Sequence, residues 1–241
     1  AGDIYIVLQK IRKRGLSTDH VVIDLMYGGF VARTPNPPIV YWLGDDLREV
    51  DPEAWAEYGE ALLQIAEARM ARTWKERLDL FLRRHVSLWT YRATLRKQLL
   101  RRIQQSEEVY NTQPWYEKPY LPDLMKDAQY QKLFDPEPFD MTEANPQIGF
   151  LERILVATAD HPPLIFLTPA NQVLMEANTS DPGYQANLRA LDAWFADKPA
   201  YYYNWESALP DRLFADHVHL TPEGYEVLAG MILDALEEME A

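Results

Sequence analysis

An aspartate and a histidine three residues apart, Asp216 and His219, are the side chains of this sequence whose types and spacing best suit acid–base chemistry. A histidine that acts as a general base presents one ring nitrogen to the group that it deprotonates. An acid on the other nitrogen fixes the tautomer and stabilises the imidazolium. If the chain carries acyl-transfer chemistry, this pair is its proton-handling half. The alternative is a loop hydrogen bond that only caps the next helix.

The residues around this pair predict a rigid support for it. Ala200–Trp205 reads as a strand that precedes the loop. After the loop, Thr221, Pro222 and Glu223 have the types expected of a helix cap, a first-turn proline and a first-turn acid. We therefore expect the pair to lie on a loop between the last strand and the terminal helix.

The rest of the chain alternates predicted helices with buried strands, which is typical of an α/β domain with a parallel sheet. A helix over 3–14 is expected to stop at Gly15, and further helices begin at Asn145-Pro146 and Asp181-Pro182. The two other predicted strands are His20–Met26, which enters a glycine loop, and Leu164–Thr168.

Residues 34–144 interrupt this pattern and are predicted to be an insertion. A possible short strand lies at 39–43. The stretch of about 53–105 has no proline and one glycine, which indicates one or two long amphipathic helices. From about 106 to 144 the chain is rich in proline and aromatic residues and is expected to form an irregular arm with one short helix near 123–134. Local packing, a lid over an acyl site and a docking surface all remain open for this arm.

Charge and composition exclude several classes of protein. The 241-residue chain has a net charge of −13, which argues against a general nucleic-acid binder. It has no cysteine, so disulfides, thiolate metal sites and cysteine nucleophiles are excluded. No apolar run approaches the roughly 20 residues that span a membrane.

The charge is distributed unevenly along the chain. Between Arg69 and Arg102 there are eleven basic residues and two acids, a net charge of +9. The default interpretation is a solvated helix face that pairs with the acidic remainder of the chain. The alternative is a contact with an acidic partner or with anionic lipid headgroups.

The stretch Asp216–Tyr225, with the sequence DHVHLTPEGY, resembles the last conserved block of the SGNH (GDSL-type) hydrolases and acyltransferases. The likeness covers about residues 1–33 and 145–241. It implies a three-layer, flavodoxin-like sandwich in which Asp216 and His219 complete a Ser-His-Asp triad. The nearest subgroup is extracytoplasmic and includes the teichoic-acid D-alanyl transfer protein and alginate acetylation proteins. Its members often carry helical insertions and an amino-terminal membrane anchor.

The resemblance also implies an oxyanion site. Asn171, after the strand Leu164–Thr168, matches the family's oxyanion asparagine, although it stands in Pro-Ala-Asn and not in Gly-x-Asn. Gly28 or Gly29 matches the glycine whose backbone N–H faces the oxyanion. The alternatives are that Asn171 satisfies turn backbone and that the glycines only form a turn that requires positive φ.

The nucleophile is the main departure from the family. None of the five serines, Ser17, Ser87, Ser106, Ser180 and Ser207, lies in a Gly-Asp-Ser block. The chain begins at Ala1 and not at methionine, so we expect the serine upstream, unless the protein has lost it. In the family the strand before this serine is central. Its absence predicts a gap in the sheet that an upstream segment or a protein partner fills, unless the sheet has rearranged.

Two functions are therefore expected from the sequence. The first is a serine acyl esterase or acyltransferase that acts on a cell-surface ester, outside the cytoplasm and membrane-associated, without metal or organic cofactor. The second is a catalytically inactive SGNH-like subunit of a larger assembly. His217 and His219 form a His-x-His pair that could ligate zinc with Asp216, but the sequence offers no second ligand cluster.

Overall fold

The computed structural model describes residues 1–16, 20–31, 47–67 and 112–240, together with isolated positions between 74 and 92. The possible strand at 39–43 and most of the basic segment between Arg69 and Arg102 lie outside these residues.

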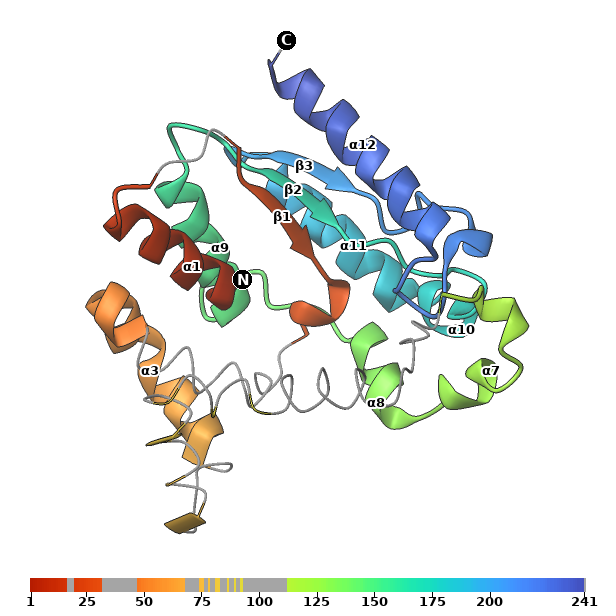
Figure 1. Ribbon diagram of the computed structural model, residues 1–241, viewed down its shortest axis with the longest axis horizontal. Helices are drawn as coiled ribbons and strands as arrows, with labels where there is room; N and C mark the ends of the chain where they lie inside the picture. Colours follow the sequence, from red (N-terminus) through yellow and green to blue (C-terminus); the bar gives the residue numbers. More distant parts are fainter. Residues whose placement is uncertain are drawn as a thin grey trace.

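Three short parallel strands form the sheet at the centre of the molecule (Figure 1). They are β1 (Val22–Leu25), β2 (Leu164–Leu167) and β3 (Tyr201–Asn204), and their order in the sheet is that of the chain. Every residue of β2 is buried, as expected for an apolar central strand of a parallel sheet. The prediction of an α/β fold with a parallel sheet is therefore confirmed.

The described sheet leaves no gap between β1 and β2. Val22 pairs with Leu164 and Leu25 with Leu167, and the Leu164 N–H donates to the Val21 carbonyl at 2.9 Å. The prediction of a central vacancy filled by a partner or an upstream strand is therefore wrong for these strands. Direct pairing of β1 with β2 satisfies the backbone groups that a vacancy would leave without partners.

Helices cover both faces of the sheet. On one face, α1 (Gly2–Lys13), α9 (Pro146–Ala157) and α11 (Pro182–Phe195) bury the alternate side chains of β1 and β2 in the main core. On the other face, α12 (Pro222–Glu240) packs over Leu164, Phe166 and Trp205 (Figure 1). The α12 layer leaves Val22 and Met26, on the β1 side, partly exposed.

The helix boundaries follow the local signals in the sequence. The side chain of Asn145 accepts the Gln147 N–H, that of Asp181 accepts the Gly183 N–H, and that of Thr221 accepts the Gly224 N–H. Each residue satisfies one of the N–H groups that the first turn of a helix leaves without partners. The predicted starts of α9, α11 and α12 are confirmed.

The described part of the insertion contains one longer helix of 16 residues and several short helical pieces. After α3 (Pro52–Glu67), the chain from residue 112 forms η2 (Trp115–Glu117), α7 (Leu121–Leu124), α8 (Ala128–Gln131) and η3 (Lys132–Phe134). The single short helix predicted near 123–134 is thus divided into α7 and, after a break, α8, which continues directly into η3. Three more short elements are η1 (Tyr27–Gly29), α10 (Glu176–Thr179) and η4 (Asp211–Leu213). Within the described ranges, none of the helices has the length and apolar character needed to span a bilayer.

Candidate active site

Asp216 and His219 form a hydrogen-bonded pair. His219 Nδ1 lies 2.8 Å from Asp216 Oδ2. Asp216 Oδ1 accepts the backbone N–H groups of Val218 at 3.0 Å and His219 at 2.8 Å, so one carboxylate both shapes the turn and orients the ring. The His219 side chain is 68% exposed, which leaves the rest of the imidazole accessible from solvent.

The surroundings of Asp216 favour its ionised form. Burial by itself would raise the pKa of this carboxyl. The contact with His217, the N–H groups of Val218 and His219, and the His219 ring together outweigh burial and hold the Asp216 pKa well below its usual range. Asp216 is therefore a carboxylate at neutral pH, as the orienting acid of such a pair must be.

The loop that carries the pair is closed at its base. Phe214 and Leu220 form an antiparallel bridge, and the Ala215 N–H donates to the His219 carbonyl at 2.7 Å. The Thr221 N–H donates to the Leu213 carbonyl at 2.8 Å, while its hydroxyl caps α12. The helix and the bridge hold both ends of the loop.

The described part of the aromatic arm packs against this loop. The backbone N–H of Trp115 donates to the Phe214 carbonyl at 2.9 Å. The Lys118 ammonium donates to the Ala215 carbonyl at 2.6 Å, and Lys118 is only 4% exposed. The rings of Tyr130 and Phe134 meet the His217 ring edge to face. Sequence reasoning missed Lys118, because a single lysine in an irregular segment carries no signature.

Asn171 lies beside the pair, but its side chain is engaged in structural hydrogen bonds. It is 0% exposed, its Nδ2 donates to the Asp216 carbonyl at 3.3 Å, and its Oδ1 accepts the Leu174 N–H at 2.9 Å. Its backbone N–H donates to the His217 carbonyl at 3.0 Å. In this structure Asn171 fastens the loop after β2 to the loop of the Asp–His pair.

Gly28 and Gly29 belong to η1, directly after β1, and neither has a positive φ. Among the described glycines only Gly15 does, at φ 67°. The Gly29 N–H donates to the Met26 carbonyl at 2.9 Å. Gly28 allows close packing, because an added Cβ would lie 2.9 Å from the Leu133 carbonyl oxygen and 3.1 Å from the Leu133 Cα.

The two glycines provide a matched test of this packing. Gly28→Ala is expected to lower the free energy of unfolding by about 1–3 kcal/mol, because the clash is with backbone that must shift. Gly29→Ala should stay within about 0.5 kcal/mol of the parent protein, since a Cβ there meets nothing within 4 Å. Urea unfolding of both variants measures the difference. Equal destabilisation would contradict this account of Gly28.

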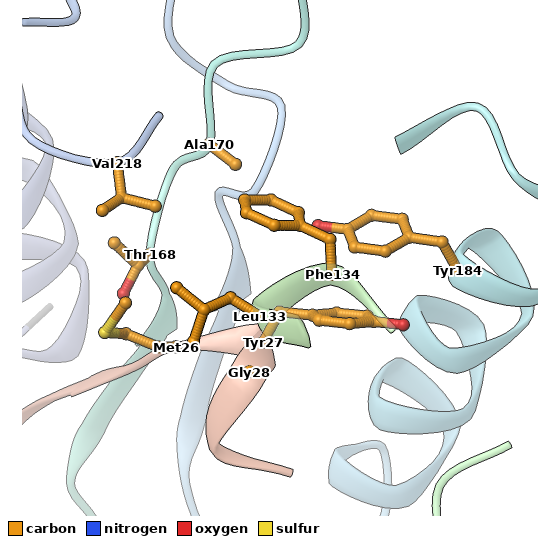
Figure 2. Close-up of a pocket in the computed structure, with 9 residues that line it drawn as sticks. All are labelled: Met26, Tyr27, Gly28, Leu133, Phe134, Thr168, Ala170, Tyr184 and Val218. Atoms are coloured by element: carbon orange, nitrogen blue, oxygen red, sulfur yellow. The ribbon is translucent and has the colours of Figure 1, made fainter. Parts of the chain in front are cut away.

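A small apolar cavity lies at the carboxyl ends of β1 and β2, the edge of a parallel sheet where α/β proteins bind ligands (Figure 2). It encloses about 20 Å³, roughly the room needed for one water molecule. Side chains from both strand ends, the arm, α11 and the Asp–His loop line it. They are Met26, Tyr27, Gly28, Leu133, Phe134, Thr168, Ala170, Tyr184 and Val218. Of these, only Gly28 was predicted from the sequence.

No serine in the described part of the chain is hydrogen-bonded to His219, and no metal cluster lies there. Ser17, Ser87 and Ser106 lie outside the described ranges. Ser180 Oγ donates to the Glu176 carbonyl at 2.5 Å, and Ser207 is exposed in the loop after β3. No group of three or more His, Asp or Glu side chains in the described part of the chain is arranged to hold a metal ion.

The fold and the site define an α/β protein with a parallel sheet and an Asp–His pair on the loop before the last helix. Comparison of the chain with family models, with curated proteins and with solved structures finds no match in any of the three.

Proposed function

We propose that this chain is an SGNH-like domain of a serine acyl esterase or acyltransferase, with the flavodoxin-like arrangement of that family. The observation that carries the proposal is the hydrogen bond of 2.8 Å between Asp216 and His219, on a ring that is otherwise 68% exposed. This is the geometry that a general base needs, with one nitrogen held by an acid and the other accessible to a hydroxyl.

In the proposed reaction the His219 ring takes the proton of a serine hydroxyl as its oxygen attacks the ester carbonyl. The protonated ring then returns the proton to the departing alcohol, which leaves an acyl-serine. Water or a second alcohol attacks the acyl-serine with the same help from His219. Asp216 stabilises the imidazolium in each step. The proposed oxyanion donors are the Asn171 side chain and a Gly28 or Gly29 N–H, and for this role Asn171 Nδ2 has to leave the Asp216 carbonyl and the Gly29 N–H the Met26 carbonyl.

The serine is proposed to come from sequence upstream of Ala1. Because β1 pairs directly with β2, a strand that carries the serine is proposed to pair along the other edge of β1. The substrate is proposed to be an ester of a cell-surface polymer, reached outside the cytoplasm by a membrane-associated protein. The basic segment between Arg69 and Arg102 is the proposed contact with an acidic partner or anionic lipid.

A second candidate function is a non-catalytic SGNH-like subunit of a larger assembly. Two observations favour it. The Asn171 side chain is fully buried with both of its polar atoms engaged, and the cavity beside the pair has room for little more than a water molecule. A subunit of this kind would use the same fold without accepting a substrate.

Labelling of the complete protein with a fluorophosphonate probe distinguishes the two functions. The enzyme is expected to be labelled on serine, and His219→Ala should slow labelling by at least about 100-fold, because the general base is lost. His161→Ala is the control, since His161 lies in the loop after α9. Absence of labelling, together with unchanged activity of His219→Ala toward p-nitrophenyl esters, would exclude the catalytic function and leave the second candidate.

A further inference from the structure

His217 is a buried histidine for which the proposed mechanism has no use. It is only 6% exposed, and its Nδ1 is buried without a hydrogen-bond partner within the described residues. Buried polar atoms are nearly always paired, so a buried ring nitrogen without a partner requires an explanation.

The position of the His217 ring is set by its neighbours. Tyr130 of α8 meets it edge to face at 5.3 Å between ring centroids, and Phe134 of η3 does so at 6.1 Å. The backbone carbonyl of His217 accepts the Asn171 N–H at 3.0 Å. Ring and backbone are thus held from three different segments, and burial keeps solvent from pairing with Nδ1.

The carboxylate of Asp216 is the group that this nitrogen faces. Asp216 Oδ1 lies 3.4 Å from His217 Nδ1, within ion-pair range but outside hydrogen-bond geometry in this conformation. A small rotation of either side chain completes the bond. Asp216 Oδ2 bonds to His219, so the carboxylate lies between two imidazole rings whose planes are 89° apart.

We propose that His217 is a positioning residue of this site, whose Nδ1–H donates to Asp216 Oδ1 and keeps Oδ2 directed at His219. Oδ1 already accepts the Val218 and His219 N–H groups, and the His217 Nδ1–H adds a side-chain donor on the same oxygen. The carboxylate then cannot rotate away from the His219 ring without breaking the bond to His217 as well. The exposed His219 handles protons, and the buried His217 orients the carboxylate of Asp216. The positioning role of His217 rests on the proposed function of the Asp–His pair. The hydrogen bond between His217 and Asp216 does not depend on that function.

The surroundings support this assignment. The contact with His217 is one of the interactions that hold the Asp216 pKa low against the opposing effect of burial. Among the described residues, the titratable and charged groups in contact with the loop include His219 on the loop itself, Tyr130 from α8, and Lys118, whose ammonium donates to the Ala215 carbonyl. None of these contacts supplies a side-chain donor to Asp216 Oδ1.

The first test is the tautomer of His217 in the intact protein, read from the imidazole nitrogen shifts in ¹⁵N-resolved NMR spectra at neutral pH. The proposal requires a proton on Nδ1, because only N–H can donate to a carboxylate. A neutral ring with its single proton on Nε2 would overturn the proposal. The measurement needs no variant and no substrate.

The second test compares two substitutions by the ¹³C carboxyl titration of Asp216. His217→Asn keeps an N–H donor close to the position of Nδ1, whereas His217→Phe keeps the ring packing and removes the donor. The pH at the midpoint of the Asp216 titration is expected to rise by about one unit or more in His217→Phe. In His217→Asn it is expected to stay near the parent value. Equal midpoints in all three proteins, or equal shifts in both variants, would overturn the proposal.

These readouts separate the inference from the proposed function. If serine labelling fails while the tautomer and the titrations agree with the proposal, His217 positions Asp216 in a non-catalytic protein. If labelling succeeds while the tautomer is wrong, the enzyme stands and His217 only packs.

Discussion

Asp216→Asn is expected to leave the protein folded and to reduce its acyl-transfer rate by about 10,000-fold, the loss seen when the orienting acid of such a triad becomes an amide. The asparagine Oδ1 can still accept the Val218 and His219 N–H groups, so the turn survives. The asparagine side chain has no negative charge, so it cannot stabilise the imidazolium of His219. Hydrolysis of p-nitrophenyl esters by the complete protein measures the loss.

Asp216→Ala is the matched variant that also removes the turn. It leaves the two loop N–H groups without their acceptor and should cost about 1–3 kcal/mol in urea unfolding at neutral pH, in addition to the loss of rate. Equal unfolding free energies for Asp216→Asn and Asp216→Ala would contradict the structural role that the geometry assigns to this carboxylate.

The stabilisation by Asp216 depends on pH in a definite direction. The Asp216 pKa is lower in the folded protein than in the unfolded chain, where it is about 3.9. Its contribution is therefore complete above that value and is lost as the pH falls toward the folded pKa. Between about pH 5 and pH 2, the free energy of unfolding should fall more steeply in the parent protein than in Asp216→Asn. If the free energies of unfolding of the two proteins changed in parallel with pH, the lowered pKa of Asp216 would be contradicted.

Tyr184→Phe, which removes one hydroxyl oxygen from the core, is expected to destabilise the protein. Tyr184 is fully buried, stacks on Tyr27 at 4.0 Å between centroids, and donates its hydroxyl to Glu206 Oε1 at 2.6 Å. Glu206 is itself buried, and its other side-chain donor is Gln172. Loss of the hydroxyl weakens the pairing of a buried carboxyl, at a cost of about 1–3 kcal/mol.

The cost of Tyr184→Phe should grow as the pH rises. Burial raises the Glu206 pKa, which the hydrogen bonds from Tyr184 and Gln172 partly offset. Because the folded pKa is the higher one, the stability linked to Glu206 is present below the unfolded pKa and is lost as the pH rises through the folded pKa. Removing the Tyr184 hydroxyl raises that pKa further, so destabilisation should be larger at pH 8 than at pH 4.

Glu206→Gln serves as the control for this effect, because it keeps an acceptor for Tyr184 and cannot ionise. Tyr184→Phe made in the Glu206→Gln background is expected to cost about 1 kcal/mol at both pH values, the worth of a neutral hydrogen bond. Urea unfolding of the four proteins at pH 4 and pH 8 completes the cycle. If the cost of Tyr184→Phe still depended on pH in the Glu206→Gln background, ionisation of Glu206 would not be the cause of that dependence.

Features that depend on neighbours along the chain were predictable. The caps at Asn145, Asp181 and Thr221 each bond to an N–H two or three residues ahead. The hydrogen bond between Asp216 and His219 spans three residues and is closed by the turn that the same aspartate forms. A few adjacent side chains determine such structures, whatever the rest of the fold does.

Features that join distant segments were decided by tertiary packing. A gap in the sheet was predicted from a family resemblance, yet β1 pairs directly with β2, more than a hundred residues away along the chain.

The site shows the same division. Its chemistry, an acid three residues from a base, is determined by the sequence alone. What surrounds that pair is determined by the tertiary structure: Lys118 reaches the Ala215 carbonyl across 97 residues, and Tyr130 and Phe134 bury His217 against Asp216. The physical reason is that burial depends on which surfaces meet when the chain collapses, and no local pattern records that choice.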